Sequence, residues 1–289
     1  MTFWVCQHTM VFLIIRRGYW MVKIDMSGKA VLITGGTKGI GLSSALYFAA
    51  AGAQVYLTYK WGSDDYAPLY AEFEKADAKK PVLVQADVSN EEDGDALFAQ
   101  MKEKESKIDY FISNVGFAQS PKGLDDYQKR SLYKTLDYST WPMIDYTRRI
   151  KKVFGKYPDH VIGVSSDGPS HFYQGYDFVA ASKALLEFFG KYMSVHLQRE
   201  GSRLNIIRFG PVKTESFMLI FGEAFFDFVR ARGIPEDMIL NPDECGKAVF
   251  GLCCGFFDAM NGQIITVDKG YPYQDNIMTQ YLNSKAKKD

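Results

Sequence analysis

The sequence predicts an α/β protein of the Rossmann type: a doubly wound, seven-stranded parallel sheet with helices on both faces. Two observations lead to this fold class. Short runs of β-branched and aliphatic residues alternate with helix-length segments, and these runs are apolar on both faces, as in a parallel sheet that helices cover on both sides. In addition, the first run leads directly into a glycine-rich turn, a combination that is typical of dinucleotide-binding folds.

Each apolar run is expected to be one strand, and the segments between the runs are long enough for crossover helices. The predicted strands cover residues 30–34, 54–59, 81–86, 108–114, 160–165, 204–208 and 263–267. Two of the intervening segments have clear helix signals. Residues 40–51 end at Gly52 and residues 180–200 end at Gly201, because glycine favours the left-handed conformation that closes a helix.

The chain is interpreted as one catalytic domain, residues 27–289, preceded by an appendage of residues 1–26 to which no function is assigned. The apolar run 10–15 within the appendage is too short to span a bilayer. Arg16 and Arg17 follow that run, whereas a signal peptide carries its positive charge before it. The appendage is therefore interpreted as an extended start or a tag-like segment.

Composition excludes several classes of function. Lys plus Arg and Asp plus Glu both total 34, so the formal net charge of zero predicts no nucleic-acid-binding surface. The cysteines form no C-x-x-C pair and have no histidine at ligand spacing, which argues against a zinc site or a disulfide framework. We expect structural thiols in a reducing cytoplasm at Cys6, Cys245, Cys253 and Cys254.

The turn after the first strand reads T-G-G-T-K-G-I-G over residues 34–41. Its glycines permit a tight turn, close approach of the backbone to a pyrophosphate, and tight contact between helix and strand. The helix that follows directs its N-terminus at the phosphates. The segment therefore predicts a dinucleotide site.

Here the chain resembles the short-chain dehydrogenase/reductase family, whose form of this loop is T-G-x-x-x-G-x-G. Four further matches occur in the family's order, at Asp87, at 113–116 (S-N-V-G), at 209–214 (F-G-P-V-K-T) and at 261–270. The resemblance covers residues 27–272 and implies adenine contacts at Asp87 and carboxamide contacts near 211–214. The implied cofactor-binding residues are Gly35, Thr37, Lys38, Gly39, Ile40, Gly41, Lys60, Asp87, Val88, Asn114, Gly116, Lys183, Pro211, Val212 and Thr214.

The second strand ends T-Y-K rather than with the acid that usually holds the ribose hydroxyls of NAD. Lys60, at the end of that strand, and Lys38, in the glycine turn, would present cations to a 2′-phosphate. NADPH is therefore the predicted cofactor, and NADH is less favoured.

The catalytic residues implied by the resemblance are Tyr176, Lys183 and Ser166. The family's usual Y-x-x-x-K would place tyrosine at position 179, which is Val179, whereas Tyr176 stands seven positions before Lys183. This Y-x6-K spacing resembles the enoyl-acyl carrier protein reductases of the superfamily, in the branch with the ordinary glycine loop. Lys183 would bind the nicotinamide ribose and promote proton donation by tyrosine, and Ser166 would bind a substrate oxygen. Tyr173 is interpreted as an aromatic wall residue.

A second feature favours the enoyl branch. Ketone-reducing members carry an asparagine near residues 137–141, whereas this chain reads D-Y-S-T-W, which looks like the enoyl reductases' D-x-S-x-aromatic stretch. The apolar segment at about 213–238 is interpreted as a lid that lines an acyl channel, or alternatively as a core or oligomer-contact element.

The predicted function is NADPH-dependent reduction of a 2-enoyl thioester, carried on acyl carrier protein or coenzyme A, in a cytoplasmic enzyme. Two alternatives remain open: a 3-oxoacyl or other ketone reductase, in which Tyr176 or Tyr173 protonates an alkoxide, and a weakly catalytic cofactor-binding regulator. The resemblance also implies a homotetramer formed through the long helices. No metal, membrane or nucleic-acid partner is expected.

Overall fold

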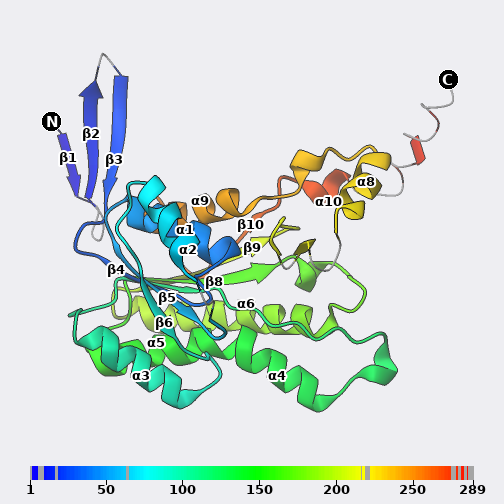
Figure 1. The fold of residues 1–289 in the computed structure, drawn as a ribbon, viewed down its shortest axis with the longest axis horizontal. Helices are drawn as coiled ribbons and strands as arrows, with labels where there is room; N and C mark the ends of the chain where they lie inside the picture. The colour runs from blue at the N-terminus through cyan, green and yellow to red at the C-terminus, as the bar shows by residue number, and fades with distance from the viewer. Residues whose placement is uncertain are drawn as a thin grey trace.

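The computed structural model describes residues 2–5, 10–16, 19–62, 65–215, 217–218, 222–274 and positions 278, 281–282 and 285, with side chains from residue 23 and without that of residue 274. Seven parallel strands form the main sheet, which confirms the predicted fold class (Figure 1). Their spatial order is β10 (Ile264–Val267), β9 (Arg203–Phe209), β8 (His160–Ser166), β7 (Tyr110–Ser113), β4 (Ala30–Ile33), β5 (Gln54–Tyr59) and β6 (Val82–Gln85).

Helices cover both faces of this sheet, as Figure 1 shows. One layer contains α1 (Gly39–Ala50), α2 (Ala67–Lys75) and α9 (Pro242–Cys253). The opposite layer contains α3 (Glu91–Lys102), α4 (Lys129–Ser139), α5 (Trp141–Phe154) and α6 (Asp177–Gln198). Shorter elements follow the strand ends: η1 (Leu124–Asp126), η2 (Gly168–Ser170), α8 (Ala224–Ala231), η3 (Glu236–Met238) and α10 (Tyr271–Gln274).

The two faces of the sheet bury separate hydrophobic clusters. Along β4, Val31 and Ile33 belong to the cluster under α1 and α9, whereas Ala30 and Leu32 belong to the cluster under α3, α5 and α6. Successive strand residues point to opposite faces, so a strand covered on both sides must be apolar at every position. This explains why the strands are recognisable as continuous apolar runs.

The N-terminal segment forms a separate three-stranded antiparallel sheet of β1 (Thr2–Val5), β2 (Met10–Arg16) and β3 (Tyr19–Asp25). The sheet extends away from the main body in Figure 1. Met26, directly after β3, is fully buried and belongs to the core beneath α1 and α9. The sequence indicated an appendage here but not its strands.

Two segments differ from their predicted bounds in ways that affect the site. The long helix begins at Asp177, three residues before its predicted start, so that Tyr176 is its N-cap residue. An acid in the first turn is favoured there by the helix dipole. The predicted lid is described in part, because residues 216 and 219–221, including Phe221, lie outside the described residues.

Candidate active site

The glycine turn between β4 and α1 is built around backbone atoms that leave no room for side chains. A Cβ on Gly41 would lie 2.6 Å from the Gly35 carbonyl oxygen and 2.8 Å from Asn114 Nδ2. Asn114 Nδ2 in turn donates to the carbonyl oxygens of Thr34 (3.0 Å) and Gly35 (3.1 Å). The turn is thus fastened to the end of β7, and its crowding matches the close backbone approach that a pyrophosphate requires.

The remaining predicted residues of the turn surround the first turn of α1. Lys38 is the N-cap residue and is exposed, Thr37 precedes it, and Ile40 lies within the helix. Gly39 has a φ of +57°, which residues with a side chain rarely adopt. A Cβ there would approach Thr214 Cγ2 to 3.6 Å. Thr214 therefore closes over the glycine turn, as expected for the segment assigned to the nicotinamide side.

The segment after β9 is held in place by Leu240. The Leu240 amide donates to the Pro211 carbonyl (3.0 Å), the Lys213 amide donates to the Leu240 carbonyl (2.7 Å), and Val212 forms a parallel bridge with Leu240. These bonds fix Pro211 and Val212 beside the turn without using their side chains.

A hollow lies at the ends of β4, β5 and β6, where the sequence places the adenosine. Its lining combines the glycine turn, three strand ends and an aromatic wall. The residues are Gly35, Thr58, Tyr59, Lys60, Trp61, Ala86, Asp87, Val88, Val115, Gly116, Phe117 and Tyr138. Five predicted cofactor residues, namely Gly35, Lys60, Asp87, Val88 and Gly116, therefore share one cavity.

Lys60 is paired in this hollow. Its ammonium lies 2.6 Å from Asp87 Oδ2 and donates to the Tyr138 hydroxyl, which itself donates to Asp87 Oδ2 at 3.0 Å. The hydrogen bond to Asp87, with a second to Tyr138, raises the pKa of Lys60. Burial opposes ionisation of Asp87, but its hydrogen bonds, led by that from Lys60, outweigh this effect and lower its pKa. Both groups are charged at neutral pH.

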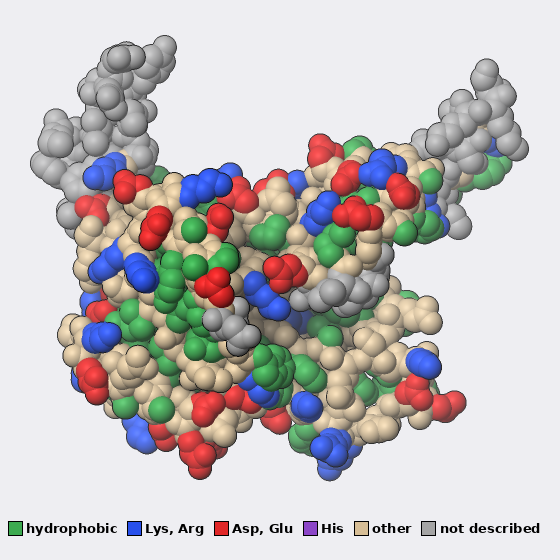
Figure 2. All heavy atoms as spheres, in the orientation of Figure 1, with side chains coloured by type: hydrophobic (Ala, Val, Ile, Leu, Met, Phe, Trp, Pro, Cys, Tyr) green, Lys and Arg blue, Asp and Glu red, His purple; other side chains and the backbone are tan. Residues whose placement is uncertain are grey.

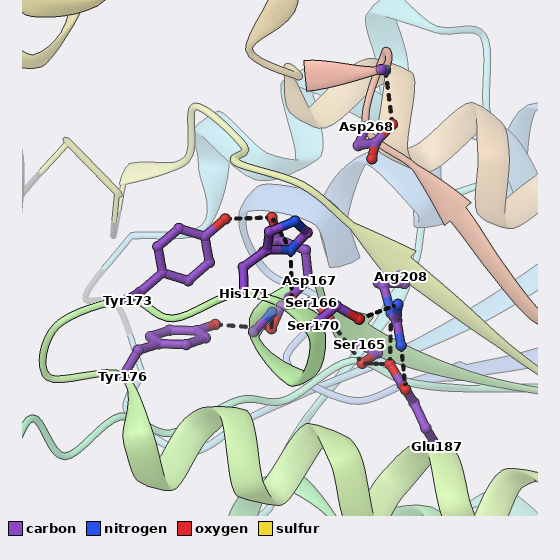
Figure 3. Close-up of polar contacts among 12 residues, drawn as sticks. Ser165, Ser166, Asp167, Ser170, His171, Tyr173, Tyr176, Glu187, Arg208 and Asp268 are labelled. Atoms are coloured by element: carbon purple, nitrogen blue, oxygen red, sulfur yellow. Dashed lines mark hydrogen bonds and ion pairs between the residues drawn. The ribbon is translucent and has the colours of Figure 1, made fainter. Parts of the chain in front are cut away.

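The predicted catalytic residues come together at the C-terminal edge of the sheet, beside the start of α6. Tyr176 and Ser166 point toward each other in Figure 3, and the Tyr176 hydroxyl donates to Ser166 Oγ at 3.2 Å. Burial raises the pKa of Tyr176, although its bond to Ser166 acts in the opposite direction. A substrate oxygen between these hydroxyls would find two donors, because both hydrogens can reorient.

Lys183 is a buried residue of α6, seven positions after Tyr176. Its Nζ donates to the Val164 carbonyl at 2.8 Å, and a Cβ on Gly116 would lie 3.8 Å from it. Burial lowers the pKa of Lys183 to about 8, while the charge of Glu187 partly counteracts this effect. The ammonium of Lys183 thus lies beside Gly116, which lines the adenosine hollow, and is bound to β8 two residues before Ser166.

Tyr173 is bound to a different partner. Its hydroxyl donates to Asp167 Oδ2 at 2.6 Å, and its ring meets that of Tyr176 edge-on with centroids 6.0 Å apart (Figure 3). Burial and the Asp167 carboxylate both raise the pKa of Tyr173. The Tyr173 hydroxyl therefore already donates its proton in a hydrogen bond to Asp167, which agrees with its interpretation as a wall residue.

A partly buried ion pair supports the loop that carries Ser166. Glu187, one helical turn after Lys183, accepts from Arg208 Nε (2.9 Å) and Nη2 (2.6 Å) and from Ser165 Oγ (2.8 Å). Arg208 Nη1 also donates to Ser170 Oγ at 2.8 Å, so the pair holds both ends of the loop (Figure 3). Sequence reasoning missed this pair, since its members stand 21 residues apart on a helix and a strand.

Three aromatic residues of the adenosine hollow were also missed: Trp61, Phe117 and Tyr138. Trp61 directly follows Lys60, so its position was a signal that could have been used. Tyr138 was considered only for its resemblance to an enoyl-reductase stretch. Its neighbour Ser139 accepts from the Phe117 amide at 3.0 Å, which joins α4 to the loop after β7.

The described residues contain no group of three or more His, Cys, Asp or Glu side chains placed to hold a metal ion. Cys245, Cys253 and Cys254 are buried free thiols, and Cys6 lies outside the residues whose side chains are described. No helix within the described part of the chain is long and apolar enough to cross a membrane.

Comparison with known proteins adds to this geometry. Residues 35–272 match the family model described as enoyl-(acyl carrier protein) reductase. The NADH enoyl-(acyl carrier protein) reductase of Aquifex aeolicus is 25% identical over 254 residues, covering 85% of this chain and 92% of that protein. The 1-cyclohexenylcarbonyl-CoA reductase of Streptomyces collinus is 28% identical over 190 residues, covering 66% and 67%.

The chain is also similar to solved structures over most of its length. A 7α-hydroxysteroid dehydrogenase, complexed with NADH and 7-oxo glycochenodeoxycholic acid, superposes with a TM-score of 0.75 at 21% identity, covering 85% of this chain and 95% of that one. A dehydrogenase/reductase from Sinorhizobium meliloti has a TM-score of 0.75 at 22% identity, covering 85% and 96%. These similarities support the fold.

Proposed function

The chain belongs to the enoyl-(acyl carrier protein) reductase family, and on this basis we propose that it reduces the 2,3 double bond of an enoyl thioester carried on acyl carrier protein or coenzyme A. It is a short-chain oxidoreductase that uses a nicotinamide cofactor. The observation that carries the proposal is the hydrogen bond between Tyr176 and Ser166, together with a buried Lys183 at Y-x6-K spacing from that tyrosine.

A reduced nicotinamide, when bound, would supply the hydride for the β-carbon of the substrate. Tyr176 donates a hydrogen bond to the thioester oxygen as it acquires enolate charge, and Ser166 adds a second donor. Lys183 would hold the ribose hydroxyls of the cofactor and would add positive charge to the site. The enolate would then take up a proton from water at its α-carbon, which completes the reduction. Preorganised donors stabilise the developing oxyanion without reorganising water.

NADPH is the cofactor we propose. β5 ends at Tyr59 and is followed by Lys60, without a carboxylate at the usual ribose-binding position, and the exposed Lys38 lies at the start of α1. A 2′-phosphate at this position would be attracted by both lysines. The 2′-phosphate would compete with Asp87 for Lys60, so the salt bridge reduces the preference for NADPH over NADH. The Aquifex aeolicus relative is described as an NADH enzyme, which makes this choice testable.

The segment around α8 is proposed to be the acyl-chain lid. Phe225 meets Phe217 edge-on with ring centroids 5.0 Å apart, and Phe226 is almost fully buried. Figure 2 shows the molecule hollowed between this region and α4 below it. An apolar lid gains about 0.8 kcal/mol for each methylene that it removes from water.

We further propose a cytoplasmic homo-oligomer, a tetramer assembled through the long helices. Phe188 and Tyr192 on α6 are 49% and 61% exposed and stack with centroids 4.6 Å apart. Exposed aromatic pairs on a helix of this length favour a protein contact. The buried thiols Cys245, Cys253 and Cys254 suit a reducing compartment.

Reduction of a 3-oxoacyl or other ketone is the second candidate, because the Tyr176–Ser166 hydroxyl pair would equally serve an alkoxide. A weakly catalytic cofactor-binding protein is the third, since Val179 occupies the usual tyrosine position.

A paired assay separates the three candidates: NADPH oxidation with crotonyl and with acetoacetyl thioesters. We expect faster consumption of the crotonyl compound. If the acetoacetyl thioester is reduced and the crotonyl thioester is not, the ketone reductase is favoured instead. If neither thioester is reduced, the weakly catalytic cofactor-binding protein is favoured.

A further inference from the structure

A second hollow, of about 220 Å³, lies at the start of α4 and is lined by polar and basic side chains. Its lining residues are Gln119, Gln128, Arg130, Ser131 and Lys134. None of these residues belongs to the cofactor or catalytic sets.

We propose that this hollow binds the phosphate and the adjoining amide of the phosphopantetheine arm that carries the acyl thioester. The inference rests on the proposed function, because both carriers named there hold their acyl group through this arm. It deepens that function by assigning a site to the part of the substrate that does not react.

The first argument is charge. Within the described residues, neither Arg130 nor Lys134 forms an ion pair with a carboxylate; Lys134 instead places its ammonium 5.0 Å from the centroid of the Phe117 ring. The cap residue Gln128, which also lines the hollow, makes no side-chain hydrogen bond to the first turn of α4, so the start of this helix lies at the hollow without a side-chain cap. Cations and a helix N-terminus together favour a phosphate.

The second argument is an unsatisfied acceptor. Gln119 Oε1 is buried and has no hydrogen-bond partner within the described structure. A buried acceptor without a donor costs about 1 to 3 kcal/mol, so a ligand that brings an N–H is favoured there. The pantetheine arm contains amide N–H groups beyond its phosphate. One ligand therefore satisfies both the free cations and the free amide oxygen.

The third argument is location. The loop from Phe117 to Gln128 begins in the adenosine hollow and passes against the catalytic segment. A Cβ on Gly175, the residue before Tyr176, would lie 3.3 Å from the Pro121 carbonyl oxygen. Figure 1 shows η1 and the start of α4 beside the N-terminal end of α6. The second hollow thus adjoins the side from which a thioester must reach Tyr176.

The loop is also tied to α6 by side chains. The Tyr127 hydroxyl donates to Asp177 Oδ1 at 2.6 Å, and its ring lies 5.0 Å from that of Phe178. A ligand in the hollow would therefore contact a loop that is bonded to Asp177 and Phe178, the two residues after Tyr176. An arm anchored there would hold the acyl group at a fixed distance from the Tyr176 hydroxyl.

The test uses four crotonyl thioesters of increasing carrier length: N-acetylcysteamine, pantetheine, 4′-phosphopantetheine and coenzyme A. With the full-length wild-type enzyme, kcat/KM should rise between the pantetheine and phosphopantetheine compounds. The double variant Arg130→Ala, Lys134→Ala should lose about fivefold or more on the phosphate-bearing substrates, and less than twofold on N-acetylcysteamine. Lys129→Ala, an adjacent cation outside the lining, is the matched control and should change none of them.

The outcomes separate this inference from the proposed function. If the wild type reduces none of the four thioesters, the proposed function itself fails. If the N-acetylcysteamine compound is reduced but the double variant lowers all four equally, or none, the phosphate site is wrong. A loss confined to coenzyme A also overturns it, because the hollow would then bind the nucleotide rather than the arm. Gln119→Leu should weaken the pantetheine compound as well, since the amide contact does not need the phosphate.

Discussion

Arg208 on β9 donates to both carboxylate oxygens of Glu187 on α6, at 2.9 and 2.6 Å, directly below the loop that carries Ser166. Removing the Glu187 carboxylate takes away the charged acceptor of two Arg208 hydrogen bonds, and Arg208 is only partly exposed to water. We expect Glu187→Gln to lower the free energy of unfolding by about 1 to 3 kcal/mol, measured by chemical denaturation. The double variant Glu187→Leu, Arg208→Met should recover most of this loss. Equal stability of wild type and Glu187→Gln contradicts the prediction.

The same carboxylate should affect the pH dependence of turnover. Burial lowers the pKa of Lys183 to about 8, and the negative charge of Glu187 keeps it from falling further. Activity that needs the ammonium should therefore decline as pH rises through about 8. Without the Glu187 charge the pKa falls, so the decline should begin at lower pH.

Both Glu187→Gln and the double variant should show this shift, measured as kcat/KM against pH. A purely structural role predicts recovery of the wild-type profile in the double variant along with its stability, and that result would rule out an electrostatic effect on Lys183.

Tyr176→Phe removes only the hydroxyl that donates to Ser166. We expect cofactor binding to stay nearly unchanged and turnover to fall by about a hundredfold or more, as for loss of a positioned proton donor. Lys183→Ala should impair both. Tyr173→Phe is the matched control, because its hydroxyl is held by Asp167. Full activity of Tyr176→Phe with a dead Tyr173→Phe would reverse the assignment of the two tyrosines.

Cofactor preference should depend on Lys60. If Lys60 and Lys38 contact a 2′-phosphate, wild type prefers NADPH, and Lys60→Asp should erase or reverse that preference by about tenfold or more. Asp87→Asn should strengthen it, because Lys60 would no longer be shared with a carboxylate that lies 2.6 Å away. The measurement is the ratio of kcat/KM for NADPH and NADH. An unchanged ratio in both variants would exclude a role of Lys60 in selection.

If the segment around α8 is an acyl-chain lid, kcat/KM should depend on the length of the acyl chain. Lengthening the 2-enoyl thioester from four to about eight carbons should raise kcat/KM several-fold, because each methylene leaves water. Phe225→Ser should flatten this rise and leave the four-carbon substrate nearly unchanged. Phe228 lies on the same helix but is 53% exposed, so Phe228→Ser should leave the chain-length dependence unchanged. Phe221→Ser should act like Phe225→Ser, although Phe221 lies outside the described residues. If kcat/KM of the wild type does not change with chain length, the segment around α8 is a structural element and not an acyl-chain lid.

The sequence predicted the seven-stranded sheet because each strand is covered on both faces, and an apolar residue at every position leaves a local signal, as Val31 and Leu32 show from opposite clusters. The glycine turn was also predictable, since the crowding at Gly41 excludes any side chain. These features depend on residues close together in the chain. The family resemblance, which rests on such local motifs, is confirmed.

Only the tertiary structure decided which distant groups meet. Lys60 and Asp87 follow the neighbouring strands β5 and β6, and Glu187 and Arg208 lie on a helix and a strand. Gln119 lines a hollow together with residues of a helix that begins ten residues later. The amino-acid type of a charged residue does not determine its partner, because pairing depends on strand order and side-chain direction rather than on local pattern. The sequence by itself determined the fold and the kind of cofactor site, whereas the packing of those elements decided the partners of Lys60, Tyr173 and Glu187.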